Sequence, residues 1–152
     1  MKRLFIFLIS MCVYLSTFAQ PAFVDKCNMS YLNMLSGLPS NFVDDIYSDS
    51  FGFIWISTHG GGLVRYDGFS YRYFGVGSDG MSLKSNTCHN VVEDRFHRLW
   101  ISFEECTEVL DLKTMHSVVP KSKNDELKRI MSQMSVKVYC DSKGYIRVVD
   151  RY

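Results

Sequence analysis

Histidines and carboxylates are the side chains best suited to acid–base chemistry near neutral pH. Glu104 and Glu105 are adjacent in a segment without a strand pattern, where we expect them to be solvated rather than to form an acid–base pair. Only one histidine, His59, stands on a glycine-rich loop, and a solvated loop histidine is its expected role. The four histidines are dispersed along the chain, at His59, His89, His97 and His116. The sequence therefore predicts no catalytic residue.

The glycine run Gly60–Gly62 and the cysteines could indicate cofactor or metal binding. The glycine run joins one expected strand to another, and no helix N-terminus follows that would hold a phosphate. No Cys-x-x-Cys or Cys/His pair has the spacing of a zinc site. We expect no cofactor and no metal, and the ligand-binding residues stay unassigned.

Four cysteines follow the apolar N-terminal segment: Cys27, Cys88, Cys106 and Cys140. An exported chain with an even number of cysteines can form disulfides. Cys88 and Cys140, however, fall at the repeat positions of Val43 and Ser48, which favours small buried thiols. The disulfide state stays open.

A repeat organises the chain. Residues Asp49–Tyr66 read DSFGFIWISTHGGGLVRY, two apolar strands around a glycine-rich loop, which is typical of a β-hairpin. The pattern recurs at Asp94–Ser102 and again, in part, at Asp141–Val148. Trp100 follows Trp55 by 45 residues, and Arg147 follows Trp100 by 47. A period of this length built only from strands predicts β-propeller blades.

The two tryptophans could stack on a sugar, but both lie in the middle of a strand at the same repeat position. Burial between neighbouring blades is therefore the role we expect for Trp55 and Trp100.

The predicted fold is all-β, a partial β-propeller of two four-stranded blades and part of a third. The first blade should contain strands at 42–48, 53–58, 62–66 and 70–74. We also expect the segment 28–34 to form a strand of an incomplete blade. An incomplete ring leaves two blade faces open, and the apolar residues expected on these faces include Phe53, Ile54, Trp55, Leu99 and Ile101. The expected organisation is a signal peptide at 1–19, a lead-in at 20–36, blades at 37–76 and 82–119, an irregular or short helical insert at 120–135, and a third blade that starts at 136–152.

The N-terminus has the features of a cleaved signal peptide. Lys2 and Arg3 precede an almost wholly apolar run, Leu4–Leu15, and small residues follow at Thr17-x-Ala19. As a helix the run would be roughly 18 Å long, too short for a hydrocarbon core of about 30 Å. We therefore expect export to the periplasm and no membrane span in this chain.

Charge argues against a nucleic-acid partner. Without Lys2 and Arg3, 15 basic residues face 16 acidic ones, a net charge of −1. The basic residues do not gather into a stripe of the kind that follows a phosphate backbone.

Several of these segments together resemble the two-component regulator propeller family. They are Gly37–Asn41 (GLPSN), the Asp49–Thr58 segment, Gly61–Leu63 and Arg65–Gly68 (RYDG). The resemblance extends from about Tyr31 to Val148 and is strongest in the first repeat. It implies the N-terminal periplasmic sensor region of a Bacteroides-type hybrid two-component histidine kinase, which would sense glycan-derived ligands when complete. No kinase residues lie in this chain, so we do not expect an enzyme.

Two other interpretations stay open. Streptogramin-type lyases are propeller enzymes with similar repeats, and a truncated, nonfunctional remnant would show the same blades. If the chain is part of a sensor, an oligosaccharide would bind only the full-length protein. The expected partners of the fragment are the remaining propeller blades or another copy of the chain.

The N-terminal pattern gives a direct prediction. When the chain is expressed in a Gram-negative host, the mature protein should begin at or near Gln20 and lie outside the inner membrane. N-terminal sequencing of the fractionated product checks this. A cytoplasmic product that retains Met1 would contradict it.

Overall fold

A computed structural model describes residues 30–79, 81–119, 126–132 and 136–150. The chain divides into two units, Met1–Tyr31 and Leu32–Tyr152, and the second contains the blades. The expected signal peptide at 1–19 lies outside the described residues. Within the described ranges, no helix is both long enough and apolar enough to cross a membrane.

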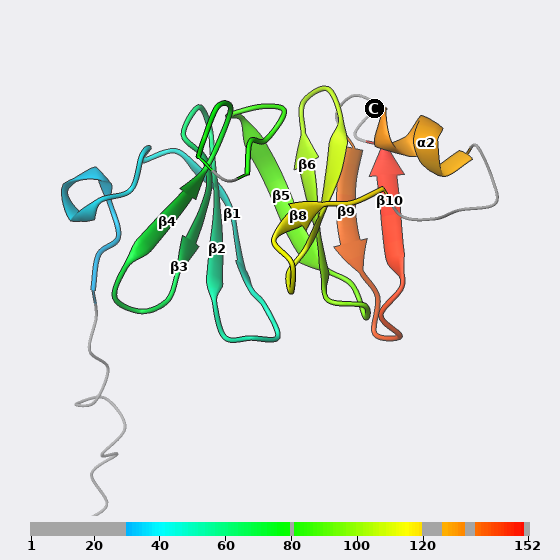
Figure 1. The fold of residues 1–152 in the computed structure, drawn as a ribbon, viewed down its shortest axis with the longest axis horizontal. Helices are drawn as coiled ribbons and strands as arrows, with labels where there is room; N and C mark the ends of the chain where they lie inside the picture. The colour runs from blue at the N-terminus through cyan, green and yellow to red at the C-terminus, as the bar shows by residue number, and fades with distance from the viewer. Residues whose placement is uncertain (1–29, 80, 120–125, 133–135, 151–152) are drawn as a thin grey trace, which may run out of the picture. The chain divides into compact units, whose positions relative to one another are not determined.

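The first blade is a four-stranded antiparallel sheet (Figure 1). Its strands are β1 (Val43–Ser48), β2 (Ile54–Thr58), β3 (Gly62–Tyr66) and β4 (Tyr71–Phe74), in that spatial order. The strand bounds predicted from the repeat agree within one residue. Gly62 has φ 78°, and a Cβ there would clash with the carbonyl oxygen of Phe74, so this position requires glycine.

The second blade repeats the first. It contains β5 (Cys88–Glu93), β6 (Arg98–Phe103), β7 (Thr107–Asp111) and β8 (His116–Ser117), again in sequential order. The register of its inner pair shifts between Cys88 and Asn90, at the same repeat position as the shift between Val43 and Asp45. The repeat therefore fixes an irregularity as well as the strands.

A short helix and a two-stranded sheet complete the described chain. Helix α2 (Glu126–Met131) falls in the expected insert, while Asn124 and Met134, which helped to predict it, lie outside the described residues. Strands β9 (Val136–Cys140) and β10 (Ile146–Asp150) pair antiparallel where the third repeat was predicted.

The lead-in differs from the expectation. The described residues before Gly37 form no strand; instead Met34–Ser36 is a 3₁₀ helix, η1. The Asn33 side chain accepts from the Ser36 backbone N–H at 3.0 Å, and the Ser36 hydroxyl accepts from the Asn33 N–H at 2.7 Å. These local side-chain bonds satisfy the backbone and so compete with strand pairing. Asn28 and Met29, also expected in the strand, lie outside the described residues.

The core lies in the seams between neighbouring sheets. Trp55 and Trp100 are 0% and 5% exposed, so their predicted burial is confirmed. Trp55 packs in the cluster that joins the first and second blades, and Trp100 in the cluster that joins the second blade to β9 and β10. The first cluster also contains Leu63, Phe74, Met81, Leu83, Cys88, Val91, Leu99, Ile101, Phe103, Leu110 and Leu112.

Leu99 and Ile101 were expected on open blade faces, but they face the adjacent blade and are fully buried. For Trp55 the sequence supported both burial and an open face, and burial is correct. Phe53 and Ile54, from the same expected set, are half-buried. Successive strand residues point to opposite faces, so the open faces carry the alternate positions. On the first blade Ile46 is 64% exposed, and Leu38 covers Ile56 and Val64. On the β9–β10 sheet, Tyr139 and Val149 are exposed.

Candidate functional site

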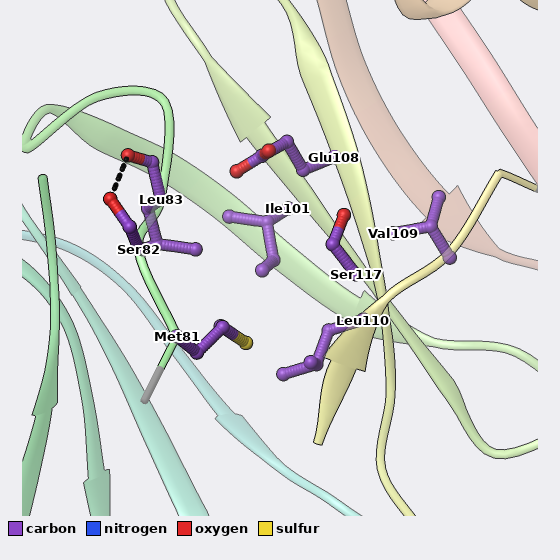
Figure 2. A pocket seen from close by; sticks show the side chains of 8 residues that line it. All are labelled: Met81, Ser82, Leu83, Ile101, Glu108, Val109, Leu110 and Ser117. Carbon is purple, nitrogen blue, oxygen red and sulfur yellow. Dashed lines mark hydrogen bonds between the residues drawn. The ribbon is translucent and has the colours of Figure 1, made fainter. Parts of the chain in front are cut away.

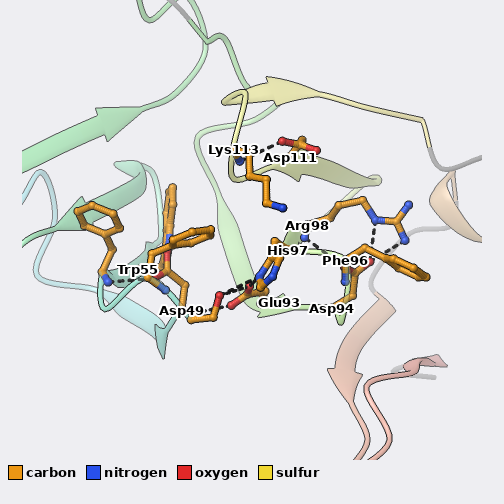
Figure 3. Close-up of polar contacts among 12 residues, drawn as sticks. Asp49, Trp55, Glu93, Asp94, Phe96, His97, Arg98, Asp111 and Lys113 are labelled. Carbon is orange, nitrogen blue, oxygen red and sulfur yellow. Dashed lines mark hydrogen bonds and ion pairs between the residues drawn. The ribbon is translucent and has the colours of Figure 1, made fainter.

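An aspartate at the β1–β2 turn organises each repeat through its two carboxylate oxygens. Asp49 Oδ1 accepts from the backbone N–H groups of Phe51 and Phe53, both at 2.9 Å, which shapes the turn. Asp49 Oδ2 accepts from Trp55 Nε1 at 2.7 Å, which fixes the indole in the seam (Figure 3). One side chain thus couples the turn to the packing between blades.

The second repeat forms the same set of aspartate bonds to its turn and its tryptophan, which we call the bracket, and adds an ion pair. Asp94 Oδ2 accepts from Trp100 Nε1 at 2.9 Å. The same oxygen lies 2.7 Å from an Arg98 guanidinium nitrogen (Figure 3). Burial favours the neutral acid at Asp94, but the hydrogen bonds from Arg98 and Trp100 outweigh it and lower the pKa of this carboxyl. The buried indole and the partly exposed arginine therefore both depend on an ionised Asp94.

The third repeat keeps the aspartate but changes its partner. Asp141 Oδ1 accepts from the backbone of Lys143 and Tyr145, as in the other two turns. Its Oδ2 accepts from Arg147, which stands at the tryptophan position, at 2.9 Å. The turn geometry therefore does not require the indole. A tryptophan stands at this position only in the first two repeats, where the side chain packs in a buried seam.

A polar clamp joins the first two blades on the side of these turns. Ser50, in the first blade, donates from its hydroxyl to Glu93 Oε1 of the second blade at 2.6 Å, and from its backbone N–H to Glu93 Oε2 at 2.7 Å. His97 Nδ1 lies 2.8 Å from Glu93 Oε1 (Figure 3). It also lies 2.9 Å from the Ser50 hydroxyl. Sequence reasoning missed this clamp, although a glutamate at the end of the apolar run NVVE was a signal for it.

The clamp combines the residue types of a hydrolytic triad without its geometry. A nucleophilic serine donates to a lone pair of the histidine that removes its proton. Here the carboxylate can only accept, so His97 Nδ1 carries the proton toward Glu93, and the Ser50 hydroxyl also donates to Glu93. The arrangement holds the two blades together and does not activate Ser50.

Side chains on the inner strands form a second set of bonds between sheets. Asp45 accepts from the Asn90 side chain at 2.7 Å, and Asn90 in turn accepts from the backbone N–H of Val138 at 3.0 Å. His89 Nδ1 lies 3.0 Å from Asp44. These contacts run from β1 through β5 to β9, one strand from each sheet (Figure 1).

The remaining residues that could do chemistry are separated in space or engaged in structure. The rings of His59 and His89 have centroids 6.4 Å apart, but within the described ranges no three His, Cys, Asp or Glu side chains are placed to hold a metal ion. Glu104, Glu105 and His116 are exposed. Gly60 and Gly61 lie in the β2–β3 turn, and Gly62 is the first residue of β3.

Three of the chain's five cysteines lie among the described residues, Cys88, Cys106 and Cys140, and all three are free thiols. Cys88 is fully buried, and its Sγ donates to the Ser57 hydroxyl at 3.2 Å. Burial raises the pKa of the Cys88 thiol to about 12, so it behaves as a packing residue.

A small cavity lies between the Met81–Leu83 segment and the second blade (Figure 2). Its volume is about 10 Å³, which is room for one water molecule at most. Met81, Leu83, Ile101 and Leu110 give it an apolar lining. It is a packing defect in the seam and not a ligand site.

Comparison with known proteins agrees with this architecture. The family model for the two component regulator propeller matches residues 37–60. The resemblance to this family is confirmed. No similar sequence was found among curated proteins.

Two solved structures from B. thetaiotaomicron resemble the chain over most of its length. The extracellular domain of the putative hybrid two component system BT3049 has a TM-score of 0.62 and 20% identity, covering 80% of this chain and 19% of that one. The corresponding domain of BT4673 has a TM-score of 0.57 and 22% identity, covering 74% of this chain and 16% of that one. The fold is a partial β-propeller, as predicted. The chain spans less than a fifth of the length of each of these proteins.

The Asp94 bracket predicts a specific loss of stability. Asp94→Asn places an amide among groups that all donate, and we expect the free energy of unfolding to fall by about 3 kcal/mol at pH 7. Glu104→Gln, at an exposed side chain in the β6–β7 connection, is the control and should change it far less. Urea unfolding followed by tryptophan fluorescence at one protein concentration measures both.

The pH dependence follows from the lowered pKa of Asp94. Its contribution to stability is complete above the unfolded-state value of about 3.9 and is lost as the pH falls through the lower folded value. The difference between the wild-type chain and Asp94→Asn should therefore shrink below about pH 4. Equal unfolding midpoints at pH 7 would contradict this account of the turn.

Proposed function

We propose that the chain is part of the exported propeller sensor of a two-component signalling protein, and that the complete protein senses a glycan-derived ligand. The observation that carries this proposal is the repeated blade, with its Asp49–Trp55 bracket inside the segment that the two component regulator propeller model matches. The likeness to extracellular domains of putative hybrid two component systems supports it.

The open sheet faces support a role within a larger ring. Ile46 and Tyr73 on the first blade and Tyr139 and Val149 on the β9–β10 sheet are between 46% and 64% exposed. In a propeller, such faces pack against neighbouring blades. Further blades, or another copy of the chain, would cover them.

Export is supported by the N-terminal pattern and by the extracellular nature of both similar structures. An exported blade array positions loops for contact with ligands outside the membrane. Signal output would need a kinase, which the described blades do not supply.

The experiment uses the natural protein that carries residues 1–152. Its cellular fraction is determined first, and its thermal unfolding is then followed with a panel of neutral and acidic oligosaccharides. We expect an extracytoplasmic protein that at least one oligosaccharide stabilises, since a ligand at 100 times its Kd adds about 2.7 kcal/mol. A cytoplasmic protein, or a panel in which no oligosaccharide raises Tm, would contradict the proposal.

A further inference from the structure

The seam between the second blade and the β9–β10 sheet opens into a cleft of about 160 Å³ on the side of the aspartate turns. The cleft lies between the β5–β6 turn and the β9–β10 turn. Two arginines and two exposed aromatic rings dominate its lining. The lining includes Asp94, Arg95, Phe96, Arg98, Gly144 and Tyr145.

Comparison with the seam between the first and second blades explains why the seam at the β9–β10 sheet is open. There, Ser50 reaches across to Glu93 and His97 and closes the gap. One repeat later, these three positions hold Arg95, Cys140 and Gly144. The carboxylate is replaced by a thiol, and the histidine ring by a hydrogen atom. The second seam thus has a cation where the first has a hydroxyl, and a thiol where the first has a carboxylate. Asp94 also lines the cleft, but it pairs with Arg98.

The Arg95 guanidinium is held in place but carries an uncompensated charge. It lies 4.7 Å from the centroid of the Phe96 ring and 5.0 Å from that of Tyr145, which is the geometry of cation–π contacts. No carboxylate of the described chain forms an ion pair with Arg95, whereas Asp94 neutralises Arg98. Neither ring accepts an N–H hydrogen bond in the way a carboxylate does, so the N–H donors of Arg95 are available to an anion.

We propose that this cleft binds a single six-membered ring that carries a carboxylate. A carboxylate matches the paired N–H donors of a guanidinium. A cavity of about 150 Å³ holds one benzene molecule, so the measured volume suits one ring and not a longer chain. Phe96 contacts both Arg95 and Arg98 through its ring, whereas Tyr145, 49% exposed, offers a ring beside the charge.

Aromatic acids and uronic acids share this chemistry, and the inference does not depend on the proposed sensor role. The test is a calorimetric titration of the full chain at low salt with benzoate, with D-glucuronate and with D-glucose. We expect saturable binding of at least one of the two acids and none of glucose. Binding of benzoate alone identifies an aromatic acid, and binding of glucuronate alone identifies a uronic acid. Failure of both acids to saturate, or equal binding of glucose and glucuronate, overturns the proposal.

Variants locate the binding. Arg95→Gln removes the charge and should raise Kd at least tenfold, and Tyr145→Ala, at an exposed ring, should also weaken binding. Arg129→Gln removes an exposed arginine on α2 and serves as the matched control with unchanged Kd. Circular dichroism checks that each variant is folded. If Arg95→Gln does not fold, Tyr145→Ala decides the question. A Kd unchanged in the folded variants overturns the assignment to this cleft.

Discussion

The structure depends on one buried carboxylate in each of the first two repeats, which is shared between a turn and an indole. Asp49 and Asp94 are 6% and 5% exposed, and an unpaired carboxylate at such positions would be costly. Each is satisfied by backbone N–H groups of its own turn and by the Nε1–H of the tryptophan six residues later. The same bonds set the turn and orient the ring, so local geometry and packing between blades cannot vary independently.

The third repeat shows what this constraint permits. Asp141 keeps its turn bonds, but an arginine replaces the indole, and the sheet face at Arg147 is exposed rather than packed. The two seams differ in the same manner. A neutral hydroxyl and a carboxylate close the first, whereas an arginine between two rings leaves the second open. Substitution at fixed repeat positions therefore changes the chemistry of a seam while the backbone is retained.

Much of the fold could be predicted because the repeat aligns turn residues, strand residues and the two tryptophans at once. The lead-in could not, because Asn33 and Ser36 form local bonds that a strand pattern does not reveal. The expected exposure of Leu99 and Ile101 is wrong. The alternation of side chains assigns residues to two faces of a strand, but it does not show which face packs against the adjacent blade. In the Ser50–Glu93–His97 clamp, Ser50 bonds to residues 43 and 47 positions later in the sequence. Such a contact can be predicted only when the packing of one blade against the next is known.

In each of the first two repeats the aspartate stabilises the fold through the indole as well as through its own turn. A double-mutant cycle on Asp49→Asn and Trp55→Phe measures this directly, because phenylalanine keeps a ring in the seam and removes only the Nε1–H donor and part of the volume. Unfolding in urea followed by circular dichroism gives the four stabilities. The account predicts a coupling free energy of about 1–2 kcal/mol, within the range seen for residues in direct contact. Additive effects of the two substitutions would contradict it.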